Sequence, residues 1–147
     1  MMSFIYHLGT PAGIFGAVGR HTGKTTAERQ RILHHWQNKI ALLAECQNVH
    51  SKISGLMMPV LGHQYHQQQR FASVAEMIDL LQPLIHHAIN MFGTERILFA
   101  SSSPMDKAST QFIDIVTAYL HILEPYGDNA LFNIFRHNAQ QIYRIEI

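Results

Sequence analysis

Three short segments rich in apolar residues divide the chain, and each is followed by residues that favour turns. They cover residues 3–7, 48–54 and 97–100, and glycine, serine or proline follows each of them closely. Segments of this length and composition are typical of strands that are buried on both faces of a sheet. The sequence therefore predicts three core strands.

Longer segments, with apolar residues three and four positions apart, lie between and after these strands. They predict helices over residues 27–46, 72–92 and 110–123, and a last helix from Asp128 to about residue 143. Thr25 or Thr26 is expected to cap the first helix, and Asp128 the last. Gly93 is expected to end the second helix, and Pro83 to kink it or remove one of its hydrogen bonds.

The order strand, helix, strand, helix, strand, helix, helix predicts an α/β domain. Strands that alternate with helices are normally parallel and are joined by right-handed crossovers. The chain has 147 residues, of which 47% are hydrophobic and 14% charged. This length and composition suit one domain with a real core, over residues 1–147.

The charge balance argues against two classes of partner. The net charge is +1 with neutral histidines, so electrostatics offers no case for nucleic acid or for an anionic membrane. No apolar run approaches the ~20 residues of a membrane span, and no secretory signal is visible at the start. The lone cysteine, Cys46, fits a reducing compartment. We therefore expect a cytoplasmic protein that binds neither nucleic acid nor membrane.

The third predicted strand is followed by the polar cluster Ser101-Ser102-Ser103-Pro104-Met105-Asp106-Lys107. In parallel α/β folds, chemistry gathers at the carboxyl ends of strands, so this cluster is a candidate site. The alternative is that the serines turn the chain and that Ser103 or Asp106 caps the next helix. Spacing by itself favours this structural interpretation.

Three stretches resemble the amidohydrolase-related family, a group of TIM-barrel metal-dependent hydrolases that includes lactonases. They are Phe4-Ile5-Tyr6-His7-Leu8-Gly9-Thr10-Pro11, Asn48-Val49-His50-Ser51-Lys52-Ile53-Ser54-Gly55-Leu56 and Arg96-Ile97-Leu98-Phe99-Ala100-Ser101-Ser102-Ser103-Pro104. The last of these is similar to the final barrel strand of the family. Two positions depart from the family pattern: its catalytic Asp falls on Ser102, and Tyr6 stands where relatives have Asp or Asn.

The resemblance implies an α/β fold that is a partial TIM (β/α)8 barrel. It would contain the last three parallel strands with their helices and an extra carboxyl-terminal helix. A complete barrel takes about 250 residues and eight strand–helix units. The His-x-His pair of the family metal site belongs to a first strand that has no counterpart in these 147 residues. We therefore expect the carboxyl-terminal portion of a hydrolase.

The resemblance also implies catalytic residues. His7 matches the family histidine and would orient water or bind substrate or metal, and the family makes a divalent metal such as zinc possible, with His7 as its ligand. Ser102 would occupy the place of the acid, and Asp106 is the nearest downstream carboxylate. Met105-Asp106-Lys107 resembles a branch of the family that carries Asn at the position of Ser102.

The substrate-binding candidates are Tyr6, Arg20 and Lys52. Arg20 belongs to a glycine-rich loop, residues 12–25, that is expected on the substrate side. Lys52 is unusual inside a core strand, and it either caps the barrel floor as a structural charge or reaches the mouth. Residues 19–25 of this loop are similar in sequence to a phosphate-binding loop. However, three residues separate Gly19 from Gly23, whereas that motif needs four between its glycines.

Three functions are compatible with these observations. The first is hydrolysis of a lactone, ester or amide carbonyl of a small-molecule substrate at the barrel mouth. Its standard mechanism is incomplete here, because the hydroxyl of Ser102 is no general base near neutral pH without a partner. The second is a non-catalytic half-barrel or remnant that forms a homo-oligomer or pairs with a complementary half-barrel, since the missing strands leave an exposed sheet edge. The third, nucleotide binding, rests on the imperfect loop alone.

Overall fold

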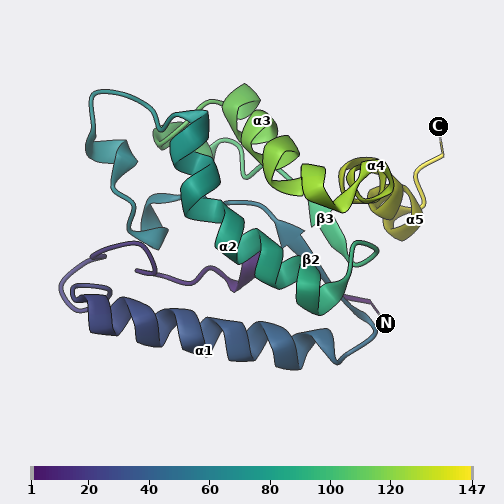
Figure 1. Ribbon diagram of the computed structural model, residues 1–147, viewed down its shortest axis with the longest axis horizontal. Helices are drawn as coiled ribbons and strands as arrows, with labels where there is room; N and C mark the ends of the chain where they lie inside the picture. The colour runs from purple at the N-terminus through teal and green to yellow at the C-terminus, as the bar shows by residue number, and fades with distance from the viewer. Residues whose placement is uncertain (1, 147) are drawn as a thin grey trace.

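The computed structural model describes residues 2–146 and contains one parallel sheet with the strand order β1-β2-β3. The strands are β1 (Ser3–Ile5), β2 (Val49–Ile53) and β3 (Ile97–Phe99). Figure 1 shows one layer of helices in front of the sheet: α1 (Thr26–Ala44), α2 (Val74–Phe92) and α3 (Phe112–Leu123). The prediction of three parallel strands joined by helices is confirmed.

The two faces of the sheet differ in what covers them. Ser51 of β2 pairs with Ile5 of β1 and with Ile97 of β3, and this row faces the helices. Alternate residues of a strand point to opposite faces. His50 and Lys52 therefore point to the other face, where both are partly exposed.

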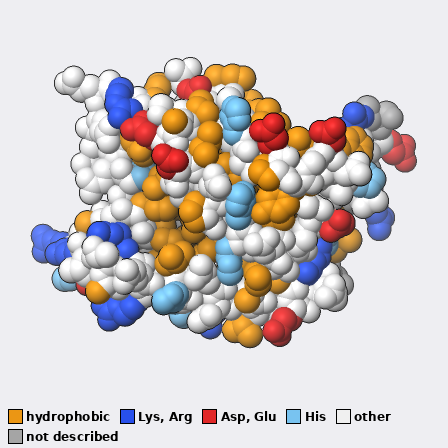
Figure 2. All heavy atoms as spheres, in the orientation of Figure 1, with side chains coloured by type: hydrophobic (Ala, Val, Ile, Leu, Met, Phe, Trp, Pro, Cys, Tyr) orange, Lys and Arg blue, Asp and Glu red, His pale blue; other side chains and the backbone are white. Residues whose placement is uncertain are grey.

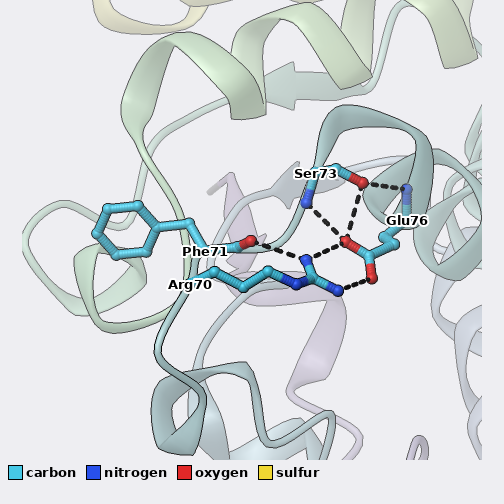
Figure 3. Close-up of polar contacts among 4 residues, drawn as sticks. All are labelled: Arg70, Phe71, Ser73 and Glu76. Carbon is cyan, nitrogen blue, oxygen red and sulfur yellow. Dashed lines mark hydrogen bonds and ion pairs between the residues drawn. The ribbon is translucent and has the colours of Figure 1, made fainter.

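Both crossover helices begin with a capping box. Before α1, the Thr25 hydroxyl accepts a hydrogen bond from the backbone N–H of Glu28, whose carboxylate accepts one from the N–H of Thr25. Thr25 is thus the residue that caps α1. Ser73 and Glu76 make the same exchange before α2, where Arg70 also forms a bidentate ion pair with Glu76 (Figure 3). The bonds from Arg70, followed by those from Ser73, lower the pKa of Glu76 to about 2.

Some boundaries differ from the predicted ones. β1 ends at Ile5, and His7 begins a short 3-10 turn (His7–Gly9) with a left-handed φ of 55°. The predicted first strand is therefore too long, because this backbone conformation turns the chain out of the sheet. α2 runs through the exposed Pro83 as one helix and ends at Gly93, as expected.

Two of the expected caps are absent from the described residues. A separate 3-10 turn (Met105–Ala108) follows β3, and Gln111, which precedes α3, makes no side-chain capping bond. The interpretation of Ser103 or Asp106 as the cap of this helix is therefore wrong. Asp128 is the first helical residue of α4 (Asp128–Phe132) and likewise provides no cap.

The predicted last helix is divided into three consecutive parts. α4 is followed by one wider π-helical turn (Asn133–His137) and then by α5 (Asn138–Tyr143). The Phe135 ring in the wider turn stacks on Phe99 of β3, with ring centroids 4.6 Å apart. The extra carboxyl-terminal helix expected from the sequence is therefore present, and it packs beside β3 (Figure 1).

The apolar core lies between the sheet and the helices. Its fully buried members include Ile53 and Ile97 from the sheet and Met77, Leu81 and Ile85 from α2. Figure 2 shows that apolar side chains also remain visible on the outer, helical face, with histidines scattered among them. Within residues 2–146, no helix combines the length and the apolar character that crossing a bilayer requires.

Candidate functional site

The ends of the three strands bring together residues that are far apart in the sequence. His7 follows β1, Ser54 and Gly55 follow β2, and Ser102 and Asp106 follow β3. Because the strands are parallel and adjacent, their carboxyl ends meet at the same edge of the sheet. We call these five residues the strand-end cluster.

His7 is held in place by Ser54. The His7 Nδ1 atom lies 2.8 Å from the Ser54 Oγ atom, and Ser54 is buried. Because Nδ1 is engaged in this hydrogen bond, Nε2 is the ring nitrogen left for a substrate, a water molecule or an ion. The bond also fixes the plane of the ring, as a catalytic histidine requires.

Gly55 leaves the space that the His7 ring occupies. Its φ is 62°, and a Cβ atom built on it would lie 2.5 Å from His7 Nδ1 and 2.8 Å from Met58 Cε. Real carbon atoms do not approach so closely, and a left-handed φ already favours glycine. The position of His7 therefore requires glycine at residue 55.

Asp106 folds back into the cluster after the turn at Pro104. Its side chain is 4% exposed, and its Oδ1 accepts a hydrogen bond of 3.2 Å from the backbone N–H of Met57. Burial raises the pKa of Asp106, while backbone hydrogen bonds at Ser102 and Met57 and the nearby His7 oppose the rise. Asp106 thus ties the segment after β3 to the segment after β2, close to His7.

Ser102 makes a different kind of contact. Its hydroxyl donates a weak hydrogen bond to the Met58 sulfur, at 3.8 Å. A thioether is a poor acceptor and cannot take up a proton at neutral pH. This contact therefore does not activate Ser102 as a nucleophile.

Lys52 lies among aromatic rings on the face of the sheet opposite the helices. Its Nζ is 4.6 Å from the ring centroid of Tyr6, 5.3 Å from that of Phe4 and 5.2 Å from that of Tyr143. Cation–π contacts of this length stabilise an ammonium group within the protein. Because Tyr143 belongs to α5, the arrangement ties α5 to the sheet and favours the structural interpretation of Lys52. Substrate contact by Tyr6 or Lys52 stays a prediction.

The glycine-rich loop places Arg20 away from secondary structure. An isolated bridge between Val18 and Thr22 closes a small turn, and Arg20 is exposed within it. Among the described residues, Arg20 forms no hydrogen bond or ion pair with the strand-end cluster. Its role in binding a substrate therefore stays a prediction.

Backbone packing explains the glycines of this loop. A Cβ atom on Gly16 would collide with the carbonyl oxygen of Gly62, and one on Gly23 with the carbonyl oxygens of Gly13 and Gly16. The N–H groups of Gly13 and Phe15 donate to the carbonyls of Val60 and Leu61, at 3.0 and 2.9 Å. The structure therefore gives the glycines a role in packing one loop against another.

The strand-end cluster does not by itself fit a metal centre. A catalytic zinc site usually takes three protein ligands. Residues 2–146 contain no group of three or more His, Cys, Asp or Glu side chains placed to hold one ion. Nε2 of His7 is a suitable donor, but the Asp106 carboxylate is buried and already accepts a backbone N–H. Most of the ligand set that the family resemblance implies is therefore missing from this cluster.

Ser54, Gly55 and Met58 were missed by reasoning from the sequence. Ser54 and Gly55 follow the second strand as the serines follow the third, so the rule that singled out Ser102 also applied to them. Met58 carried no such signal. Its contact with Ser102 depends on how two separate loops fold against each other.

The sequence is similar to known proteins over most of its length. A family model described as Amidohydrolase matches residues 17–145. The protein y4mH of Sinorhizobium fredii is 30% identical over 110 residues, which are 75% of this chain and 33% of that protein. The chain thus spans about a third of the curated relative that it matches.

Solved structures show the same arrangement of strands and helices. An amidohydrolase from Burkholderia multivorans with bound HEPES has a TM-score of 0.76 at 18% identity, and its form with bound zinc has 0.75 at 19%. Both matches cover 97% of this chain and 44% of the other. Amidohydrolase 2 from Bifidobacterium longum subsp. infantis has a TM-score of 0.55 at 20% identity, and the match covers 99% of this chain and 40% of that one. The fold of this chain therefore matches part of a TIM barrel.

Proposed function

Because the chain belongs to the amidohydrolase family, we propose that its strand-end cluster takes part in the hydrolysis of a lactone, ester or amide carbonyl at the mouth of a TIM barrel. The observation that carries this proposal is the bond between His7 Nδ1 and the buried Ser54 Oγ. It holds a histidine at the carboxyl end of a barrel strand, which is where TIM-barrel enzymes place their catalytic groups.

His7 would act as the general base. When Nδ1 carries the ring proton and its N–H donates the hydrogen bond to Ser54 Oγ, Nε2 presents a lone pair. Nε2 then accepts a proton from water as the water oxygen attacks the carbonyl carbon. The same proton passes to the alcohol or amine that leaves when the C–O or C–N bond breaks. Ser54 itself is buried, so we assign it the orientation of His7.

Asp106 and Ser102 would support this step in different ways. Asp106 is close enough to His7 for their charges to interact, and its carboxylate would stabilise the imidazolium that forms when His7 takes the proton. Ser102 stands in the place of the family acid and would at most donate a hydrogen bond to the substrate. Tyr6 and Arg20 are exposed and remain proposed substrate contacts.

The proposal concerns a barrel of which this chain is one part. The chain covers 44% of the similar Burkholderia structures, so further polypeptide must provide the other strands. Any zinc ligands besides His7 would come from that polypeptide. The exposed and unpaired Cys46 suits a reducing compartment, and we place the activity in the cytoplasm.

The test compares the chain by itself with the chain co-expressed with the polypeptide encoded directly upstream, on a panel of lactones and small esters. We expect little or no turnover by the chain itself, and no rescue by Ser102→Asp, because a single carboxylate does not restore the missing positioning. The complemented barrel should turn over at least one substrate. His7→Ala should lower that rate by about 10²–10⁴-fold, whereas His34→Ala, at an exposed position of α1, should not. Equal rates for wild type and His7→Ala would refute the proposed role.

A second candidate function is a non-catalytic half-barrel that pairs with another chain. The contact of Ser102 with the Met58 sulfur favours it, because no activated group then stands where the family has its acid. In that case the complemented barrel would assemble in sedimentation but stay inactive on every substrate of the panel.

A further inference from the structure

One long stripe of α1 borders an open groove. The other wall is the segment that follows β1, including Leu8 and Pro11, and the groove has a volume of about 810 Å³. Its floor is apolar, with Ile5, Trp36 and Ile40 among its lining residues. Trp36 is fixed there because its Nε1 donates a hydrogen bond of 2.7 Å to the carbonyl of Leu8. We call this feature the α1 groove.

The α1 groove runs along the helix and is not a compact hole. The α1 residues that line it recur every three or four positions from Glu28 to Leu43, so they form one face over about four turns, or roughly 22 Å. α2 packs between α1 and α3, whereas α1 has α2 as its helical neighbour among the described residues (Figure 1). A stripe of this length suits a second helix better than a small molecule.

The rim of the groove is positively charged. Arg31 and Lys39 are exposed on it, and His35 lies between them. The carboxylate of Glu28 also lines the groove, but it already accepts the backbone N–H groups of Lys24 and Thr25. A second copy of the chain placed here would bring like charges together. An occupant with acidic residues beside its apolar stripe would match both features.

The edge of the sheet beside the groove is also open. The Ser3 N–H donates to the carbonyl of Asn48 in the segment before β2. Successive backbone groups of a strand point to opposite sides. The N–H and C=O of Phe4 therefore point away from β2, toward the open side of the sheet, and the next residue, Ile5, lines the α1 groove.

We propose that the α1 groove docks an amphipathic helix with acidic flanks, which belongs to the polypeptide that completes the barrel. In a TIM barrel each outer helix packs between two neighbours, and α1 lacks one of them within the described residues. The strand joined to the docked helix would pair with Phe4. This inference rests on the proposed function only in taking the chain as one part of a barrel, and it does not require catalysis.

The test uses two designed helical peptides that share an apolar stripe at positions i, i+3, i+4 and i+7 and contain no tryptophan. One carries glutamate beside the stripe and the other carries lysine. Trp36, the only tryptophan of the chain, reports binding through its fluorescence. The glutamate peptide should bind about 2- to 30-fold more tightly at low salt, which is the range that two exposed ion pairs provide. The difference should shrink as salt screens the charges.

Variants locate the binding site. Arg31→Glu combined with Lys39→Glu should reverse the preference, so that the lysine peptide binds more tightly. Leu43→Asp, in the groove, should abolish binding of both peptides. Leu42→Asp is the matched control, because Leu42 is more exposed on the same helix and does not line the groove. Circular dichroism checks that each variant stays folded.

Two results would overturn the proposal. One is equal binding of the two peptides, or binding that Leu43→Asp leaves unchanged. The other is a dimer in sedimentation that Leu43→Asp dissociates, since a second copy would then be the occupant. Inactivity of the complemented barrel, together with binding of the glutamate peptide by the chain itself, would refute the proposed hydrolysis and leave this docking site standing.

Discussion

The two edge strands of the sheet, β1 and β3, differ in whether their outward backbone groups find hydrogen-bond partners. At β3, the side chain of Asn138 donates hydrogen bonds to the carbonyls of Thr94 and Ile97, each 2.7 Å long. The Ile97 carbonyl points away from β2, because the neighbouring Arg96 carbonyl accepts the N–H of Ser51. At β1, the backbone of Phe4 has no such cover within the described residues. Within the described residues, the outward carbonyl of Ile97 in β3 is therefore covered by a side chain, whereas the outward backbone groups of Phe4 in β1 are not.

The covered edge should be the more sensitive to a single mutation. Asn138 is 2% exposed, so Asn138→Ala leaves the buried carbonyl of Ile97 and the partly buried carbonyl of Thr94 without this donor. We expect a loss of about 2–4 kcal/mol in the free energy of unfolding, measured by urea denaturation. Gln141→Ala, at an exposed position of α5, is the control and should change little. Equal effects of the two substitutions would mean that Asn138 does not close the edge.

The open side depends on the bond between Trp36 and Leu8. Trp36→Phe keeps an aromatic ring but removes the Nε1 donor, which leaves the Leu8 carbonyl unpaired. We expect a loss of about 1–3 kcal/mol in the free energy of unfolding. Limited proteolysis should also become faster in residues 9–25, because this bond holds the segment after β1 against α1. Loss of stability without faster cleavage would contradict the second part of this prediction.

Asp106 follows β3 and accepts a hydrogen bond from the segment after β2. Its titration should make the stability of the protein depend on pH. Burial raises its pKa above the ordinary value of 3.8, so the native state holds its proton at a pH where the unfolded chain has lost it. Its stabilising contribution is then complete below about 3.8 and is lost as the pH rises through the native pKa. Asp106→Asn should remove this decline in urea titrations between pH 3 and 7. Asp79→Asn, at an exposed position of α2, should keep it.

Glu76 should have the smallest effect on stability of the four residues. The pH dependence of its contribution should have the opposite sign to that of Asp106. The pKa of Glu76 is lowered to about 2, so its contribution is complete above the unfolded value of 4.5 and is lost as the pH falls through about 2. Glu76→Gln should lower the thermal midpoint slightly at neutral pH, and the difference from wild type should vanish in strong acid. Because the ion pair with Arg70 is exposed, added salt should weaken the effect. A difference that persists below pH 2 would point to another cause.

Much of the fold could be predicted from local patterns. The three strands, the two crossover helices, the Thr25 cap and the end of α2 at Gly93 all depend on residues that are close in the chain. The predicted bounds that are wrong belong to segments whose local conformation depends on contacts with distant residues. The predicted first strand is too long because His7 takes a left-handed φ, at a position where its ring packs against Gly55 in a distant segment. The last helix widens where Phe135 meets Phe99, a contact that no local pattern encodes.

In the candidate site, too, some features depend on local sequence and others on contacts between distant residues. The order of the segments predicted three parallel strands with the polar cluster of Ser102 and Asp106 after the third, because strand direction and side-chain alternation are local properties. His7 was singled out by its resemblance to the family histidine. Only the tertiary structure decided their partners. It placed Ser54 on His7, turned Ser102 toward Met58 and buried Asp106 on the backbone of Met57. Each of these contacts joins loops more than 40 residues apart, and the geometry between such loops is set by packing, which a linear sequence does not display.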